Sequence, residues 1–151
     1  MRISTSLGSF VLLVTIFVHV AFAQTVGALP EVRMSDGIEF LTGGIGSDES
    51  AAIKKVQEKW PLTLLFAISS GGHAIYAADV AARITNLDGK LVFHTRSDGP
   101  FLLVRLAPGK YIVEAKNAGI TASRNFEIVN SKSTSVKMIW PDQTGSLLGT
   151  R

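Results

Sequence analysis

The stretch DGPFLLVRLAPGKYIVEA, residues 98–115, decides the fold class of this chain. Residues 101–106 are apolar enough for a buried strand. From Tyr111 every second residue is apolar as far as Ala115, which is the period of a half-buried strand. The sequence Ala-Pro-Gly-Lys at 107–110 supplies turn residues between the two segments. The stretch therefore predicts two consecutive strands joined by a turn.

Strand-like segments of similar length continue on both sides of this unit. Turn residues such as Asp88-Gly89 separate them, because aspartate and glycine tolerate the backbone angles of tight turns. No helical pattern lies between the strands, as a parallel sheet would require. We predict an all-β fold, a seven-stranded antiparallel β-sandwich over residues 62–140. Its strands are expected at residues 62–68, 74–86, 91–94, 101–106, 111–116, 120–129 and 134–140.

One amphipathic helix is expected just before the sandwich, at residues 47–60. Its apolar residues are spaced by three and four, which places them on one face: Ile53, Val56 and Trp60. The side-chain oxygen of Ser47 is expected to cap the first turn, and the proline that follows Trp60 ends the helix. A helix of this length is marginal in water, so we expect it to dock on the sandwich.

The N-terminal 23 residues have the pattern of a signal peptide. Arg2 precedes an apolar run at residues 9–20, and Ala21-Phe22-Ala23 supplies a small-residue cleavage site. The run is shorter than the roughly 20 residues of a membrane anchor, and no basic stop-transfer flank follows it. We expect cleavage after Ala23 and export to the periplasm or the medium, with no membrane span in the mature chain.

Two segments flank the helix and the sandwich. Residues 24–46 form a linker-like lead-in with a possible short strand at 38–41, and residues 141–151 are expected to form a flexible tail.

The amino-acid composition limits the kinds of chemistry that the chain can carry out. The chain has no cysteine, which excludes disulfides, thiol catalysis and cysteine-ligated metals. Its 15 Lys and Arg against 12 Asp and Glu are mostly spread singly, so we expect no nucleic-acid partner.

The stretch quoted above resembles the carboxypeptidase regulatory-like domains. The shared pattern is Asp-Gly-x-Phe, a leucine five residues after the phenylalanine, and Pro-Gly-x-Tyr with alternating apolar positions. It is carried here by Asp98, Gly99, Phe101, Leu106, Pro108, Gly109, Tyr111 and Val113. The resemblance covers residues 62–140 and implies a seven-stranded transthyretin-like sandwich in which Phe101, Leu106 and Tyr111 point inward. The run from Gly43 to Glu49 is also similar to one that precedes such a domain in small periplasmic bacterial proteins.

The resemblance implies a fold and no activity, because this domain is a non-catalytic appendage in its namesake enzymes. The transthyretin-like 5-hydroxyisourate hydrolases carry active-site histidines and end in Tyr-Arg-Gly-Ser, whereas this chain ends in Leu-Leu-Gly-Thr-Arg. A zinc carboxypeptidase would need a longer chain and a His-x-x-Glu pair. We therefore expect a protein that is not an enzyme and has no catalytic residue and no cofactor.

Several residues were weighed as candidate sites. The Gly43–Glu49 run lacks the Gly-Lys-Ser/Thr of a phosphate loop and is expected to be a helix entry, with a recognition loop as the alternative. His73 and His94 are expected to be exposed, since neither has a carboxylate at ligand spacing. Calcium would need converging aspartates, and two of the three candidates precede glycine in turns. Those three are Asp79, Asp88 and Asp98, and we assign no metal site.

Four aromatic residues are candidates for a sugar-stacking platform: Trp60, Tyr76, Tyr111 and Trp140. Of these, Tyr111 and Trp140 are expected in the core. We predict an exported, non-enzymatic binding or assembly module of the cell envelope, whose partner is an envelope protein or a glycan. Contact is expected through edge strands or the Gly43–Glu49 run. The alternatives are a small envelope enzyme or carrier with a site built from scattered residues, and a carbohydrate-binding module.

Overall fold

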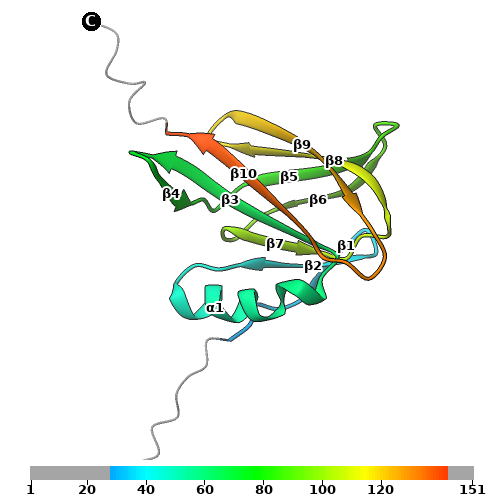
Figure 1. The fold of residues 1–151 in the computed structure, drawn as a ribbon, viewed down its shortest axis with the longest axis horizontal. Coiled ribbons are helices and arrows are strands. Elements are labelled where there is room, and N and C mark those ends of the chain that lie inside the picture. The colour runs from blue at the N-terminus through cyan, green and yellow to red at the C-terminus, as the bar shows by residue number, and fades with distance from the viewer. Residues whose placement is uncertain (1–27, 143–151) are drawn as a thin grey trace, which may run out of the picture.

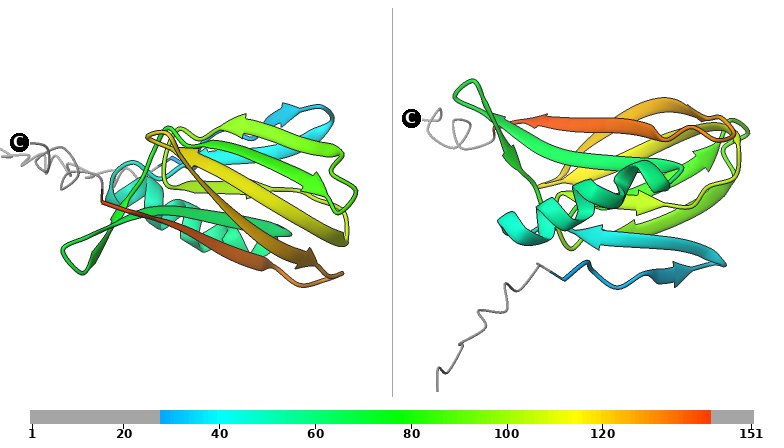
Figure 2. Two further views of the ribbon diagram at one scale, coloured as in Figure 1. Left: turned by 90° about the horizontal axis from the view of Figure 1, so that it is seen from above. Right: turned by 60° about the horizontal axis from the view of Figure 1, so that its bottom comes forward.

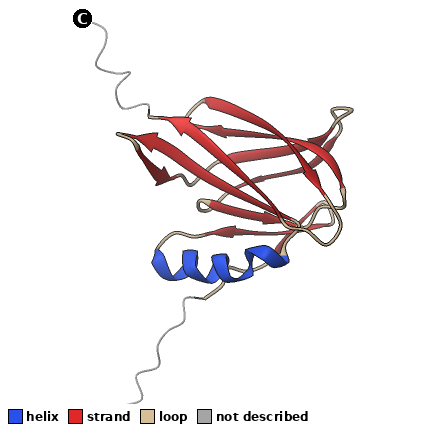
Figure 3. Cartoon of the chain, viewed as in Figure 1, coloured by secondary structure: helices blue, strands red, loops and turns tan. Residues whose placement is uncertain are grey.

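Two β-sheets stack face to face, and one helix lies on the outside of the stack (Figure 1). The structure is a computed structural model that describes residues 28–142. Strands dominate the described chain and the helix is short (Figure 3), so the predicted all-β, sandwich-like architecture is confirmed. The predicted signal peptide, residues 1–23, and the last nine residues of the predicted tail, 143–151, lie outside the described residues.

The described strands divide into a six-stranded sheet A and a four-stranded sheet B. Sheet A has the order β1 (Arg33–Ser35), β2 (Ile38–Gly43), β7 (Phe101–Val104), β3 (Leu62–Ser70), β10 (Thr134–Pro141). Its sixth strand, β4 (His73–Tyr76), pairs with the second half of β3, on the edge whose first half pairs with β7. Sheet B has the order β6 (Leu91–Arg96), β5 (Ala81–Asn86), β8 (Gly109–Asn117), β9 (Ile120–Ile128).

One strand pair departs from the predicted antiparallel sandwich. β10 runs parallel to β3, in a register from Thr134↔Leu62 to Pro141↔Ser69. The antiparallel prediction is wrong for this pair, because a parallel pair does not require a helical crossover in this fold. Here the chain leaves β3, passes through β4 and β7 of sheet A and all of sheet B, and returns from β9 to the far edge of β3. A path through the second sheet thus replaces the helix.

The predicted strand at residues 74–86 is two strands in different sheets, β4 and β5. Between them the chain crosses from sheet A to sheet B, with Ala77 and Val80 buried on the way. Asp79 takes a positive φ of 60° at this crossing. The alternating sequence does not reveal such a crossing. In the structure β4 is exposed along its whole length, whereas β5 buries Ala82 and Ile84. The predicted lead-in likewise contains two strands, β1 and β2, that complete sheet A.

The two sheets also meet along their edges. Trp140 Nε1 of β10 donates to the Ile120 carbonyl of β9 at 3.0 Å, and Thr134 Oγ1 donates to the Glu127 carbonyl at 2.9 Å. On the opposite side, β1 contacts β6. The edge strands of sheet B and the outer strands of sheet A therefore cover one another, which protects most of the open backbone.

The main core fills the space between the sheets. Its largest fully buried side chains include Phe66, Phe93 and Met138. Leu106, Tyr111 and Trp140 belong to it, as predicted. Phe101 is buried but faces the other way, into a second cluster beneath the helix. The inward direction implied for Phe101 is therefore wrong, because its side chain lies on the outer face of sheet A.

Helix α1 (Ser47–Val56) continues into a short 3-10 turn, η1 (Gln57–Lys59), and lies across the outer face of sheet A (Figure 2). The predicted bounds, 47–60, are too long, because α1 ends at Val56 and Trp60 follows η1 with extended backbone. Ile53 of the predicted apolar face is buried, and Trp60 is buried beyond the end of the helix. They form the second cluster with three residues of β2 and β7: Leu41, Phe101 and Leu103. Ser47 makes no side-chain cap bond, so that prediction is wrong; its hydroxyl bonds Asp48 instead.

Among residues 28–142, no helix has the length and apolar character needed to cross a membrane.

Candidate functional site

The glycine-rich run before α1 is tied to the first turn of the helix. The Gly44 N–H donates to Glu49 Oε1 at 2.5 Å, and Ser50 Oγ donates to the Gly44 carbonyl at 2.6 Å. Ser50 is buried, so its hydroxyl needs this acceptor. The run therefore serves as the predicted helix entry. Because the Glu49 carboxylate already takes the Gly44 amide, that amide is not free for an anionic ligand.

Two glycines are required by close approach of backbone and side chain. A Cβ at Gly99 would lie 2.3 Å from the Gly43 carbonyl oxygen. A Cβ at Gly44 would lie 2.4 Å from the Phe101 ring, and Gly44 has a φ of +96°, which favours glycine. Packing thus explains Gly44 of the Gly-Gly pair and the glycine of the Asp-Gly-x-Phe pattern.

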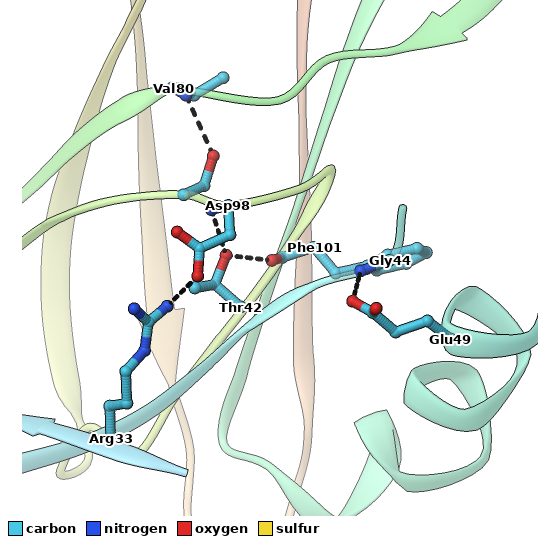
Figure 4. A network of polar contacts seen from close by, with 8 residues as sticks. Arg33, Thr42, Gly44, Glu49, Val80, Asp98 and Phe101 are labelled. Atoms are coloured by element: carbon cyan, nitrogen blue, oxygen red, sulfur yellow. Dashed lines mark hydrogen bonds and ion pairs between the residues drawn. The ribbon is translucent and has the colours of Figure 1, made fainter. Parts of the chain in front are cut away.

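The loop between β6 and β7 is fixed from three directions (Figure 4). Thr42 Oγ1 of β2 donates to the Phe101 carbonyl at 2.9 Å and accepts from the Asp98 N–H at 3.1 Å. The buried Ser97 hydroxyl accepts from the backbone just before β5. Arg33 of β1 forms an ion pair with the Asp98 side chain. The polar residues of this loop therefore act in the structure of the sandwich.

A groove of about 440 Å³ lies between the beginning of α1 and strand β4. We call it the α1–β4 groove. It brings together the glycine-rich run and an edge strand, which sequence reasoning treated as two separate candidates for partner contact. Its lining residues are Gly44, Gly46, Ser47, Ser50, Ala51, Lys54 and Tyr76.

Strand β4 has an open edge beside this groove. The Ala77 N–H donates to the Phe66 carbonyl, so the pairs bonded to β3 occur at alternate residues. The alternation directs the backbone groups of Ala74 and Tyr76 away from β3. All four residues of β4 are exposed, and Ile75 and Tyr76 retain 56% and 48% of their surface. The hairpin of β3 and β4 projects beyond the other strands (Figures 1 and 2).

Of the described residues that line the groove, Lys54 is the one with a charge. Its Nζ lies 5.9 Å from the centroids of both the Tyr76 and the Phe101 rings. The two rings meet edge to face at 5.9 Å. None of the ion pairs among residues 28–142 involves Lys54. The groove therefore offers a cation held over aromatic surface, next to open backbone.

Three other hollows lie on the described part of the molecule. One of about 290 Å³ adjoins η1 and the loop between β9 and β10, where Arg105 stacks on Trp60 at 4.6 Å and bonds Glu39. Another of about 200 Å³ is largely apolar and is lined by Ile68, Ile120 and Trp140. A third, of about 340 Å³, has Lys110 and Glu127 in its lining. The charged residues of the first hollow are Glu58, Lys59, Arg105 and Lys132.

The two histidines are both exposed, as predicted. His73 begins β4, on the opposite face from Tyr76 by strand alternation. His94 Nδ1 lies 3.8 Å from Asp36 Oδ2, but both side chains keep more than 60% of their surface. This pair lies outside the hollows described above, so it lacks the enclosure of a catalytic histidine and carboxylate.

The three aspartates considered for calcium lie apart and have separate partners. Asp88 accepts from Asn86, and Asp98 pairs with Arg33. Asp79 accepts a forked pair of hydrogen bonds from Arg96. These bonds lower the pKa of the Asp79 carboxyl, and the same contact raises the pKa of Arg96. In residues 28–142 no three His, Cys, Asp or Glu side chains gather as a metal site would require.

Tyr76 is the exposed ring among the four aromatic candidates. Trp60, Tyr111 and Trp140 are buried. A sugar-stacking platform requires exposed ring faces, and Tyr76 alone offers one here, partly covered by Lys54. Of the candidates left open by the sequence, Trp60 thus belongs to the core and Tyr76 to the α1–β4 groove.

Residues 62–140 match the family described as the Rhizobiales growth-associated tandem repeat domain. The chain belongs to this family. No curated protein matches the sequence. The family match begins with β3 and ends within β10, so it includes β4 and all of sheet B. The strands β1 and β2 and the helix α1 precede the matched region, although they complete sheet A and cover its outer face.

The α1–β4 groove was missed as a unit because its walls come from separate parts of the sequence. One signal for β4 was present: residues 73–76, His-Ala-Ile-Tyr, follow a Gly-Gly turn and contain no acidic or basic residue apart from the histidine. An apolar edge strand without charge is a strand that can pair with another chain.

Proposed function

We propose that this member of the Rhizobiales growth-associated tandem repeat family is an exported, non-enzymatic binding or assembly module of the cell envelope. The N-terminal sequence supports export to the periplasm or the medium, through its basic start, apolar run and Ala-Phe-Ala end at residues 21–23. The family description refers to growth and to a domain that occurs in tandem repeats.

The open edge of β4 carries the proposal. The other outer strands of the two sheets are covered by contacts between the sheets, whereas β4 projects with uncovered backbone and two exposed apolar side chains, Ile75 and Tyr76. An extended segment of a partner protein gains backbone hydrogen bonds when it adds to such an edge. The partner is an envelope protein, and its segment lies along β4 as an additional strand of sheet A.

The finer fold is part of the proposal. The sandwich is of the transthyretin-like, carboxypeptidase regulatory-like type, with seven family strands and an accessory hairpin strand. Support comes from the Asp-Gly-x-Phe and Pro-Gly-x-Tyr pattern at residues 98–111, and from a strand within each of the seven predicted segments. On this assignment β4 is the accessory strand, and the partner site is an addition to the common sandwich. A non-catalytic role agrees with that assignment.

Site-specific photo-crosslinking in the native host tests this function. A photoreactive phenylalanine analogue at position 76, on the open edge, should join the protein to a partner. The same analogue at position 123, on an exposed part of β9, serves as the control. Adduct formation at position 76 that disappears when Ala74→Pro removes an edge N–H supports the proposal, with Ala74→Ser as the matched control. Equal labelling from both positions contradicts it.

Export is checked in the same cells. The protein should fractionate with periplasmic or secreted proteins and begin at Gln24. A product that stays in the cytoplasm with residues 1–23 intact would contradict the localisation.

A further inference from the structure

The charge of the α1–β4 groove indicates which kind of segment it accepts. Among residues 28–142, Lys54 is the single charged residue that lines the groove, and no ion pair between these residues neutralises it. Its Nζ is held over the Tyr76 and Phe101 rings, at 5.9 Å from each centroid. The aromatic rings limit the directions that the side chain takes and leave its ammonium group available on the groove side.

The groove face and the open edge meet at Tyr76. The side chains of Ala74 and Tyr76 lie on the α1 side of sheet A, since Tyr76 contacts Phe101 there. The outward backbone groups belong to the same two residues. A strand that pairs with them therefore turns every second side chain toward α1 and Lys54.

Two candidate occupants from within this protein carry no acidic side chain to meet Lys54. A second copy pairing through its own β4 would bring the sequence His-Ala-Ile-Tyr, which carries no acid to meet Lys54. The segment at residues 143–151, Gln-Thr-Gly-Ser-Leu-Leu-Gly-Thr-Arg, has no acidic side chain and one arginine. A different polypeptide that carries an acidic residue fits the groove better than either.

We infer that the α1–β4 groove binds an extended segment of another protein that carries a glutamate or aspartate side chain opposite Lys54. This inference rests on the proposed function and adds the chemistry of the partner. Backbone pairing with Ala74 and Tyr76 supplies the affinity, and the carboxylate on Lys54 selects the register and the sequence. Because only these two residues present open backbone, each bond adds little and the single contact is weak.

A synthetic peptide tests the inference. The probe is the capped hexapeptide Val-Thr-Glu-Thr-Val-Thr, which alternates as a strand and carries one glutamate. Two further peptides replace the glutamate with glutamine or lysine. Titration into isotope-labelled protein, residues 24–151, should shift the amide signals of Ala74 and Tyr76. We expect a dissociation constant of about 0.1–1 mM for the glutamate peptide. The glutamine peptide should bind about fivefold more weakly, as expected for one exposed ion pair.

Matched variants test whether Lys54 is the residue that causes the preference for the glutamate peptide. Lys54→Glu should reverse the order, so that the lysine peptide binds best. Lys55→Glu changes the same charge at an exposed neighbour that does not line the groove and should leave the order unchanged. A glutamate peptide with methylated backbone nitrogens should not bind, because it cannot donate to the β4 edge. This last comparison leaves the protein unaltered, so it does not depend on the folding of a variant.

The outcomes distinguish a failure of the selection by Lys54 from a failure of the strand-pairing function. Equal binding of the three peptides at β4 overturns the selection by Lys54 and leaves the strand-pairing function standing. Shifts confined to residues distant from β4, or no binding by any peptide, overturn both. A preference for glutamate that Lys55→Glu removes and Lys54→Glu does not would also overturn the assignment of Lys54.

Discussion

The close contact between β2 and the loop before β7 depends on a glycine, which has no Cβ. The hydrogen atoms of Gly99 are the only substituents that let this loop approach the Gly43 peptide, since a Cβ would lie 2.3 Å from the Gly43 oxygen. The same loop places Asp98 for Thr42 and Arg33, and it leads directly into the buried Phe101. A larger side chain at position 99 would therefore disturb both the contacts of Asp98 and the packing of Phe101.

Gly99→Ala should destabilise the protein by about 1–3 kcal/mol, because the backbone must move to admit the methyl group. Chemical denaturation followed by circular dichroism measures the change. Asp98→Ala is the matched control in the same loop. It removes an exposed ion pair and should change the free energy of unfolding by about 1 kcal/mol or less. Equal effects of the two substitutions would show that the close approach is easily relieved.

At the scale of one element, α1 depends on the residues that it buries. Ile53 is fully buried against sheet A, and the helix is too short to be stable alone. Ile53→Ala should cost about 2–5 kcal/mol. Amide hydrogen exchange should also become faster in α1 than in sheet B, because the helix loses its anchor first. Lys55→Ala, at an exposed position of the same helix, should change neither quantity appreciably. Uniform acceleration in both sheets would contradict local detachment.

Elements were predictable where periodicity is local. The spacing of Ile53 and Val56 located the helix, although its end was placed too late, and apolar runs or alternation located a strand in every predicted segment. Features set by distant partners were not predictable. The cap of α1 failed because Glu49 and Ser50 reach back to Gly44. The parallel β3–β10 pair depends on the path of the chain through both sheets, which no local pattern records.

The candidate site was predictable only in its parts. Edge strands and the Gly43–Glu49 run were each named as places of contact, and the groove joins them. Its two walls are set by the way α1 docks and by the projection of the β3–β4 hairpin. Tyr76 and Lys54 therefore come into contact through tertiary packing, and the residues next to them in the sequence do not predict this contact.

At the scale of the whole molecule, the family match does not include everything that the sandwich needs. Residues 62–140 contain β3 to β10, but β7 pairs with β2 along its entire length. The outer face of sheet A is covered by α1 and by Leu41 of β2. Without the preceding segment, Phe101 and Leu103 would meet water, and the backbone of β7 would lose a partner.

A protein restricted to residues 62–142 should therefore fail to fold cooperatively, whereas residues 28–142 should fold. Each large apolar side chain that loses its burial costs about 1.5–3 kcal/mol. Exposure of Phe101 and Leu103, with the loss of Leu41 and Ile53, removes an amount comparable with the 5–15 kcal/mol that holds a typical domain together. Thermal unfolding and the dispersion of amide signals compare the two proteins directly. A cooperative transition in the shorter protein, at a temperature close to that of the longer one, would mean that sheet A is stable without its helical cover. In that case the α1–β4 groove would be an addition to a self-sufficient repeat. A molten or aggregated product would mean that the groove and the fold depend on the same contacts between α1 and sheet A.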